Sequence, residues 1–219
     1  MRIALTRAPG HNDVLARRLR DAGFQVVEAP LVRIEPIPGP PIRAGGYDWL
    51  VLTSRPAVDE LLRRLDGPLP SVAVIGPGTA AALRAHGIEP ALVARRSTQE
   101  GLVEALPRPA GRVLFAGAEG ARDAIVRELD ADFVPLYRTV ERRPECFPAA
   151  DLAVLASPSA ARSFAALGRA EPCITIGPST SEEARRHGVT VAAEAATHDL
   201  DGLVEAVKLA ASSIASSRS

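Results

Sequence analysis

The stretch from Asp151 to Gly188 shows how the chain is organised, because a similar sequence occurs earlier in the same chain. It reads DLAVLASPSAARSF, then a short connection, then CITIGPSTSEEARRHG, while the stretch from Asp48 to Gly87 begins DWLVLTSRPAVDEL and ends SVAVIGPGTAAALRAHG. Each stretch starts with an acidic residue and an apolar strand and turns through a serine into a helix. Each then runs a second strand through Gly-Pro into a helix that closes at His-Gly. We interpret the pair as an internal repeat.

The repeat extends to the rest of the chain. The segment GLVEA occurs at 101–105 and again at 202–206, and residues 1–36 match residues 111–144. The chain order is therefore a short unit, a long unit, a short unit and a long unit, which predicts two similar domains. A general likeness among α/β sequences is the alternative, and we disfavour it because Gly-Pro, His-Gly and GLVEA recur in one order.

The overall composition narrows the class of protein. A chain of 219 residues fits one large domain or two small ones. A protein that binds nucleic acid neutralises phosphates with basic residues. The net charge of zero therefore argues against a nucleic-acid partner. Lys208 is the only lysine, so the basic charge is nearly all arginine. Arginine suits carboxylates, but we favour genome composition as the explanation.

The cysteines and the apolar runs point to a cytoplasmic protein without a bound metal. Cys146 and Cys173 are far apart and make no metal-ligand spacing, and Cys173 opens an apolar strand where we expect it in the core. Met1 and Arg2 lead straight into a strand without a secretory signal. No apolar run approaches the ~20 residues of a membrane helix, so we expect no membrane contact.

Strands that alternate with helices on short loops predict parallel sheets. Strands are expected at 3–6, 24–27, 31–34, 48–53, 72–75, 91–94, 112–116, 132–136, 151–156, 174–176 and 189–192. Helices are expected at 11–22, 57–65, 118–129 and 199–211, and after the turns at 76–79, 157–158 and 177–180. Ser97 and Glu100 predict a capping box for a helix that runs through Leu106. The serine-rich segment 212–219 predicts a frayed tail.

Two irregular segments suggest how the units combine. Residues 36–46 are rich in Pro and Gly, and residues 138–148 are charged and contain Pro. If both are crossings between domains, domain 1 is discontinuous and comprises 1–36 and 148–219, while domain 2 comprises 44–138. A cleft then lies between the domains. A simple split into 1–106 and 111–219 is the alternative.

Candidate binding residues lie in the turns that follow the strands. Ligands of open parallel sheets bind beyond the carboxyl ends of the strands, where helix N-termini favour anions. The candidates from these turns are Arg7, Thr53, Ser54, Gly76, Thr79, Ser157, Ser159, Gly177, Ser179 and Thr180. Any one hydroxyl alone is more simply an ordinary N-cap. Because hydroxyl-bearing turns recur in both halves, we interpret them together as a site for a large polyanion.

Other chemical signatures are missing from the sequence. Gly76-Pro77-Gly78 lacks the glycine spacing of a dinucleotide fingerprint, and there is no P-loop and no Gly-x-Ser-x-Gly elbow. The histidines make no metal-ligand pair on one helix face. Tyr137 differs from its repeat counterpart Val32. From position alone, packing at a hinge is favoured over a hydroxyl that reaches the cleft.

The chain resembles the uroporphyrinogen-III synthase family from Arg2 to about Val207. The segments that carry the resemblance include LTRAPGHNDVLARRLRDAGFQVVEAPLVRIEP, DWLVLTSRPAV, VAVIGPGTAAALRAHGI, RVLFAGAEGARDAIVREL, VPLYRTV, ASPSAARSF, ITIGPSTSEEARRHGV and DGLVEAV. The resemblance implies two flavodoxin-like α/β domains joined by a two-stranded connector. It implies a lyase that closes hydroxymethylbilane into uroporphyrinogen III, inverting the last pyrrole ring and losing water. It implies no metal or organic cofactor.

The resemblance also implies roles for single residues. Tyr137 matches the family's functional tyrosine, which reverses the interpretation from position alone. Arg122 matches an arginine in the helix of the short unit, whereas Ala116 stands where many bacterial members have arginine. The hydroxyl residues that match are Thr53, Ser54, Thr79 and Thr180.

The expected partner is hydroxymethylbilane, a linear tetrapyrrole with eight carboxylates. We expect a monomer that uses no nucleic acid, and a transient contact with hydroxymethylbilane synthase is left open. Domain closure is expected about residues 34–46 and 138–148. The rival hypothesis is a non-catalytic two-domain sensor or binding protein for a small ligand.

Overall fold

The computed structural model describes residues 1–217 and divides the chain into two compact units. Unit 1 comprises Met1–Arg33 and Val140–Ser219, and unit 2 comprises Ile34–Thr139. The chain therefore passes from one unit to the other at 33/34 and again at 139/140. The domain limits drawn from the sequence stay a prediction.

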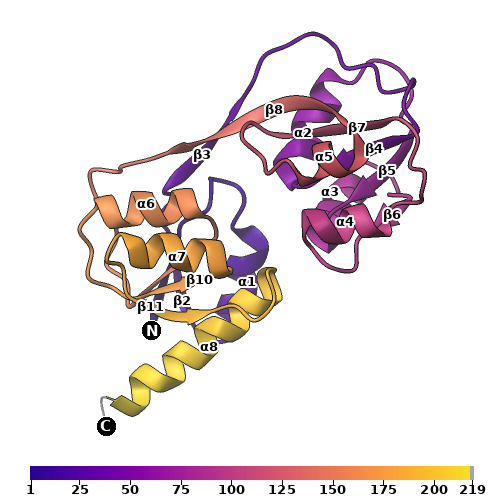
Figure 1. Cartoon of the computed structure of the whole chain (residues 1–219). Helices are drawn as coiled ribbons and strands as arrows, with labels where there is room; N and C mark the ends of the chain where they lie inside the picture. The colour runs from indigo at the N-terminus through magenta and orange to yellow at the C-terminus, as the bar shows by residue number, and fades with distance from the viewer. Residues whose placement is uncertain (218–219) are drawn as a thin grey trace. The chain divides into compact units, whose positions relative to one another are not determined.

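Unit 1 contains a five-stranded sheet in the order β11-β10-β9-β1-β2, and its paired strands are parallel. Its strands are β1 (Arg2–Leu5), β2 (Gln25–Glu28), β9 (Leu152–Leu155), β10 (Cys173–Thr175) and β11 (Val191–Glu194). Its helices are α1 (Asp13–Asp21), α6 (Pro158–Ala166), α7 (Pro178–Arg186) and α8 (Leu200–Ser217). In Figure 1, α6 and α7 lie on one side of this sheet and α8 on the other, so both faces are covered.

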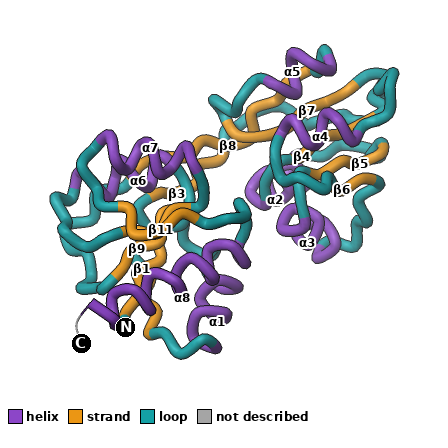
Figure 2. Tube along the Cα trace, turned by 60° about the horizontal axis from the view of Figure 1, so that its bottom comes forward, coloured by secondary structure: helices purple, strands orange, loops and turns teal. Residues whose placement is uncertain are grey.

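Unit 2 contains a six-stranded sheet in the order β3-β8-β7-β4-β5-β6. Its strands are β3 (Val32–Pro36), β4 (Trp49–Leu52), β5 (Ser71–Val74), β6 (Leu92–Val93), β7 (Val113–Ala118) and β8 (Asp132–Glu141). Its helices are α2 (Arg55–Arg64), α3 (Pro77–Ala85), α4 (Gln99–Ala105) and α5 (Ala124–Leu129). Figure 2 shows the strands of each unit in orange between purple helices.

Burial on both faces explains why the strands carry no polar alternation. Leu50 and Leu52 pack with residues of α2 and α3, whereas Val51, which points the other way, packs with residues of α4 and α5. All three side chains are fully buried. Each such side chain contributes about 1.5–3 kcal/mol of burial free energy, and a strand buried on both faces needs apolar residues at every position.

Strands that are equivalent in the internal repeat occupy the same places in the two sheets. Unit 1 reads β2-β1-β9-β10-β11 and unit 2 reads β8-β7-β4-β5-β6, with β3 added beyond β8. Numbered along the chain, unit 1 has the 2-1-3-4-5 order of a flavodoxin-like sheet. Unit 2 has a circularly permuted form of this order, because β7 and β8, the repeat equivalents of β1 and β2, come last in its part of the chain. The predicted fold class, two similar parallel α/β units, is confirmed. The two-stranded connector stays a prediction, although β3 and β8 are neighbours in the sheet and both continue across the unit boundary.

The predicted helix at 118–129 is wrong in its first half. Strand β7 continues through Ala118, and α5 begins only at Ala124. Gly120 has φ +71, a left-handed conformation, and the N–H of Ala121 donates to the carbonyl of Ala118 at 3.1 Å. A tight turn thus delays the helix. The strand predicted to end at Leu136 also extends further, through Glu141, because β8 has β3 as a second neighbour.

Two predictions about helix ends are also wrong. The cap of α4 is Thr98 and not Ser97, since the Thr98 hydroxyl accepts from the N–H of Gly101 at 3.0 Å. Helix α8 continues to Ser217 where a frayed tail was predicted, and residues 218–219 lie outside the described chain. Serine hydroxyls in this segment donate to helix carbonyls one turn earlier, Ser212 to Lys208 at 3.0 Å and Ser213 to Leu209 at 3.1 Å. These bonds satisfy the hydroxyls within the helix.

Candidate functional site

A hydroxyl pair in unit 2 is the most specific feature of the candidate site. The phenol oxygen of Tyr137 lies 2.8 Å from the Oγ of Ser54. Tyr137 is on β8 and Ser54 follows β4, and β7 lies between these two strands. Neighbouring strands are ~4.8 Å apart, so the tyrosine ring must cross the whole width of β7 to reach the serine.

Small residues on β7 make this crossing possible. Ala118 is paired in register with Tyr137, and Ala116, two residues earlier, lies on the same face of β7. Ala116 is fully buried, and both alanines pack in the same apolar cluster as Tyr137. Two small side chains on this face of β7 thus leave room for the ring of Tyr137.

The environment of Tyr137 keeps its hydroxyl protonated. Tyr137 is only 6% exposed, and this burial raises the pKa of its phenol, while the hydrogen bond with Ser54 opposes the shift to a smaller extent. Ser54 is itself held in place, because its Oγ accepts from the N–H of Ala57 at 3.2 Å and caps α2. The predicted cap at Ser54 is confirmed. Tyr137 can thus serve as a proton donor at neutral pH.

The other predicted residues of unit 2 lie around the first turns of α2 and α3. Thr53 is half-buried after β4, and Gly76 is the N-cap of α3 with an extended backbone. A Cβ on Gly76 would lie 2.5 Å from the Oγ of Ser97, so a glycine lets that hydroxyl approach the helix start. Thr79 lies in the first turn of α3 and is 5% exposed.

Unit 1 repeats this arrangement at the turns after β9 and β10. Ser157 caps α6 by accepting from the N–H of Ala160 at 3.2 Å, as predicted, and its Oγ lies 3.0 Å from the Oγ of Ser159. Gly177 is the N-cap of α7. The next residues differ in exposure, since Ser179 is exposed whereas Thr180 is only 1% exposed.

The fold brings most of the predicted residues to the carboxyl edge of a sheet within their own unit. In unit 1 the strand order reverses between β1 and β9, and half-buried Arg7 follows β1 while Ser157 follows β9. In unit 2 it reverses between β7 and β4, the strand pair over which Tyr137 meets Ser54. Such switch points are where open α/β sheets bind ligands.

Arg122 also lies at the carboxyl edge of the sheet of unit 2, in the turn between β7 and α5. It precedes α5 instead of lying in it, its side chain is exposed, and it donates to Glu100 of α4 at 3.1 Å. The expectation of an arginine inside the helix of the short unit is therefore wrong. The residue is held by a surface ion pair with Glu100.

Sequence reasoning missed two residues next to the predicted turns. They are Ser97 and His198, each of which lies close to a glycine N-cap. A Cβ on Gly177 would lie 2.9 Å from the imidazole Cδ2 of His198, just as a Cβ on Gly76 would lie 2.5 Å from the Oγ of Ser97. Ser97 and His198 occupy equivalent places in the repeat, one residue before the cap of the last helix of each long unit. An alignment of the two halves at this loop carries the signal that could have found them.

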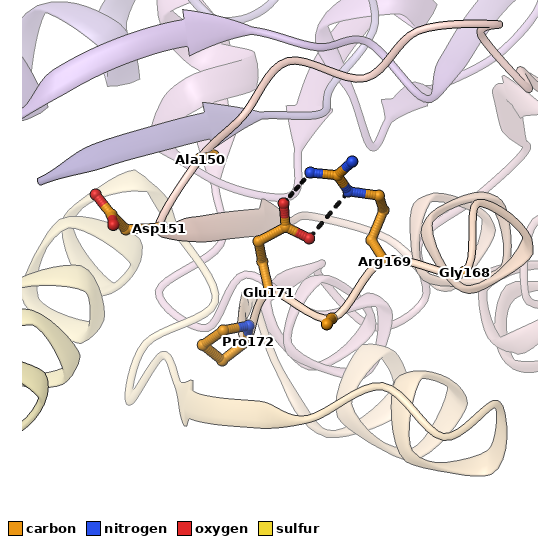
Figure 3. A pocket seen from close by; sticks show the side chains of 7 residues that line it. Ala150, Asp151, Gly168, Arg169, Glu171 and Pro172 are labelled. Carbon is orange, nitrogen blue, oxygen red and sulfur yellow. Dashed lines mark hydrogen bonds and ion pairs between the residues drawn. The ribbon is translucent and has the colours of Figure 1, made fainter.

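Two pockets lined by described residues lie away from these turns. One pocket of unit 1, shown in Figure 3, is lined by Ala150, Asp151 and the segment 168–172. Asp151 and Pro172 immediately precede β9 and β10, so this pocket lies at the amino edge of the sheet, opposite to the candidate turns. Arg169 and Glu171 form an ion pair across it.

The described residues offer no obvious metal site. Within residues 1–217, no group of three or more His, Cys, Asp or Glu side chains is placed to hold a metal ion. The same part of the chain has no helix whose length and apolar character suit a membrane span.

The fold and these turns define a protein of two flavodoxin-like units with hydroxyl-rich helix starts. The family model described as uroporphyrinogen-III synthase HemD matches residues 13–205. The chain belongs to the uroporphyrinogen-III synthase family, whose members are lyases of tetrapyrrole biosynthesis.

Individual relatives agree with this assignment. The chain is 29% identical to the uroporphyrinogen-III synthase of Synechococcus elongatus, in an alignment that covers 94% of each chain. It is 25% identical to a putative uroporphyrinogen-III synthase of Methanocaldococcus jannaschii over 64% of this chain and 63% of the relative.

Solved structures show the same fold. The crystal structure of uroporphyrinogen-III synthetase from Helicobacter pylori matches with a TM-score of 0.65 and 17% identity, covering 95% of this chain and 100% of that one. A mutant uroporphyrinogen III synthase from Thermus thermophilus matches with a TM-score of 0.58 and 17% identity, over 97% of this chain and 99% of that one.

Proposed function

We propose that this chain closes hydroxymethylbilane into uroporphyrinogen III, with inversion of the last pyrrole ring and loss of water. The observation that carries the residue roles is the contact between the buried phenol of Tyr137 and the Oγ of Ser54, at 2.8 Å. Family membership supports the reaction, and this contact supports Tyr137 as the proton donor.

The proposed reaction begins with loss of the hydroxyl group of the substrate. Tyr137 donates its proton to the leaving oxygen, the C–O bond breaks, and water departs. The electron pair of the pyrrole nitrogen stabilises the resulting azafulvene cation. A substituted α-carbon of the last pyrrole ring then attacks the cation and forms a spiro intermediate. The bond from this carbon to the methylene bridge of the neighbouring ring breaks, and the free α-carbon of the last ring bonds to that bridge, which inverts the ring. Loss of the proton from this α-carbon restores the pyrrole and balances the proton that Tyr137 gave. Ser54 orients the phenol and is placed to return a proton to it.

The turns of both units supply the binding groups in this proposal. The first N–H groups of a helix have no partner within the helix and favour carboxylates. A substrate with eight carboxylates suits a chain that has neutral net charge and a single lysine but hydroxyls at several helix starts. The proposed binding residues are Arg7, Thr53, Ser54, Gly76, Thr79, Arg122, Ser157, Ser159, Gly177, Ser179 and Thr180.

Exposure divides these residues into two kinds. Ser159, half-buried, and Ser179, exposed, are open to direct contact with substrate carboxylates. Thr79 and Thr180 lie in the first turns of α3 and α7 with their side chains buried, so we propose that they position these turns. Holding the ends of the bilane together matters because closure without inversion competes with the enzymatic reaction, and orientation alone can contribute about 7–11 kcal/mol to a barrier. We also propose that the chain acts as a cytoplasmic monomer without a cofactor.

The test is the isomer of the product. The purified chain is incubated with hydroxymethylbilane made enzymatically, and the porphyrins are separated after oxidation. An excess of the type III isomer over a sample without the chain supports the proposal. Type I alone, at the rate of the blank, contradicts it and favours the non-catalytic ligand-binding alternative.

A further inference from the structure

The strand that carries Tyr137 ends in an ion-pair network of unit 1. Strand β8 crosses from unit 2 into unit 1 between Thr139 and Val140 and ends at Glu141, four residues after Tyr137. The Oε1 of Glu141 accepts from the Nε of Arg162 on α6 at 2.7 Å. The Nη1 of the same arginine donates to Glu183 on α7 at 3.1 Å. One guanidinium thus connects the end of β8 to two helices.

The network is held firmly on the side of the helices. Glu183 is only 11% exposed in its side chain, and its second oxygen accepts from Arg186 at 2.7 Å. The hydrogen bond from Arg162 is the main reason that the pKa of Glu183 is lowered, so this carboxylate stays ionised. A planar guanidinium suits two carboxylates at once better than an ammonium does.

A backbone bond fixes the same end of β8. The N–H of Arg142 donates to the carbonyl of Leu31 at 2.8 Å, next to the start of β3. On the unit 2 side, the N–H of Ile37 donates to the carbonyl of Leu136, also at 2.8 Å. The strand is therefore bonded on both sides of Tyr137 and of the boundary, and Glu141 is the side chain through which it is tied to α6 and α7.

The internal repeat shows that this network is not a general feature of the fold. The equivalents of Arg162, Glu183 and Glu141 in the other half are Asp59, Ala82 and Pro36. Asp59 pairs instead with His86 of its own unit, at 3.5 Å. The bridge to the crossing strand is present only in the half that receives the end of β8.

We propose that Arg162 is a positioning residue for Tyr137, because it fixes the end of β8 against α6 and α7. With the end of the strand held, the register and twist of residues 137–141 are restricted, and so is the place of the phenol over β7. The kinetic part of this inference rests on the proposed function. A misplacement of 1 Å at a reacting group can cost ~100-fold in rate. Because β8 stays paired along its length without the ion pair, we expect a smaller displacement of the phenol and a rate loss of about tenfold.

The test compares Arg162→Met, Arg162→Lys, Glu141→Gln and the double variant Arg162→Met/Glu141→Gln, with Asp59→Asn as the matched control from the other half. We expect Arg162→Met to lower kcat by about tenfold with KM within about twofold. Glu141→Gln shows a similar loss, and the double variant loses no more than the worse single one, because both remove the same bridge. Arg162→Lys recovers part of the rate, and Asp59→Asn keeps the wild-type rate.

Hydrogen exchange of the amides of residues 137–141 is measured on the same variants. Faster exchange in Arg162→Met and Glu141→Gln, but not in Asp59→Asn, supports the inference. A wild-type kcat in Arg162→Met, additive losses in the double variant, or unchanged exchange overturns it. If the wild-type chain forms no type III product, the proposed function fails, and the exchange measurement still decides whether Arg162 holds β8.

Discussion

The substitution Tyr137→Phe separates the chemical role of the phenol from its role in packing. The ring stays in the apolar cluster that contains Ala116 and Ala118, and only the hydroxyl is removed. Ser54 keeps the N–H of Ala57 as a partner at 3.2 Å, so no buried group of Ser54 is left without one. We expect a stability loss of about 0.5–1.5 kcal/mol, the net contribution of one hydrogen bond. For a chain of this size that is a fall in Tm of roughly 1–6 °C.

The expected effect on turnover is larger than the effect on stability. A positioned general acid typically contributes 10²–10⁴-fold. The substrate also loses its hydroxyl without an enzyme, so we expect the low end, a fall in kcat of about 100-fold without complete loss. Such a fall corresponds to about 2.7 kcal/mol of barrier. The rate of type III formation from hydroxymethylbilane, measured below saturation and at saturation, gives this number.

The chain supplies its own control. Tyr47 is the other tyrosine, and its hydroxyl donates to Asp132 at 2.8 Å at the amino edge of the same sheet. Tyr47→Phe loses a hydrogen bond of similar length but lies away from the proposed site, so its turnover should equal that of the wild type. A Tyr137→Phe variant that forms type III product at the wild-type rate would remove Tyr137 from the mechanism.

Three further measurements follow from the described contacts. Burial raises the pKa of Tyr137 above the ordinary tyrosine value of about 10, so turnover should stay constant up to that pH and fall as pH rises through the raised pKa. A loss of turnover well below pH 9, or one that persists in Tyr137→Phe, contradicts this expectation. Burial raises the pKa of the Cys173 thiol to about 12, so a thiol reagent at pH 8 should modify exposed Cys146 alone in the folded chain and both thiols after unfolding. Two rapidly reacting thiols in the folded chain contradict the buried strand. Gly202→Ala should lower the free energy of unfolding by about 1–3 kcal/mol, because its Cβ would lie 2.1 Å from a backbone carbonyl oxygen. Gly78→Ala, whose Cβ would have nothing within 4 Å, should raise the free energy of unfolding by about 0.5–1 kcal/mol. Equal urea midpoints for the two variants contradict the close approach at Gly202.

The sequence predicts the fold well where local patterns and the repeat agree. Ser54 and Ser157 were recognisable as caps, and buried strands bounded by Gly-Pro turns led to the parallel sheets. Helix α5 was overestimated because the turn at Gly120 depends on a left-handed backbone that glycine permits but does not impose. The cap of α4 was displaced by one residue, since Ser97 and Thr98 are equally suited to the role and only the approach of Ser97 to Gly76 separates them.

The candidate site was less accessible to sequence reasoning. The contact between Tyr137 and Ser54 depends on three strands that are not consecutive in the chain, β8, β7 and β4. Position alone favoured packing for Tyr137, and the family resemblance supplied the functional role. The burial of Thr79 and Thr180 was not visible either, because a hydroxyl residue in the first turn of a helix can face the solvent or the sheet. Arg162 has no sequence signal of its own, since its partners lie on two other elements.

The most direct test of the proposed site maps where the reaction product binds. Uroporphyrinogen III, kept reduced, is added to the isotopically labelled chain, and the backbone amide shifts are followed by NMR. We expect the largest shifts in both units, at the turns 53–55, 76–79, 157–159 and 177–180 and near Tyr137. Shifts confined to the pocket at 168–172, or to the turns of one unit alone, would contradict the proposed site.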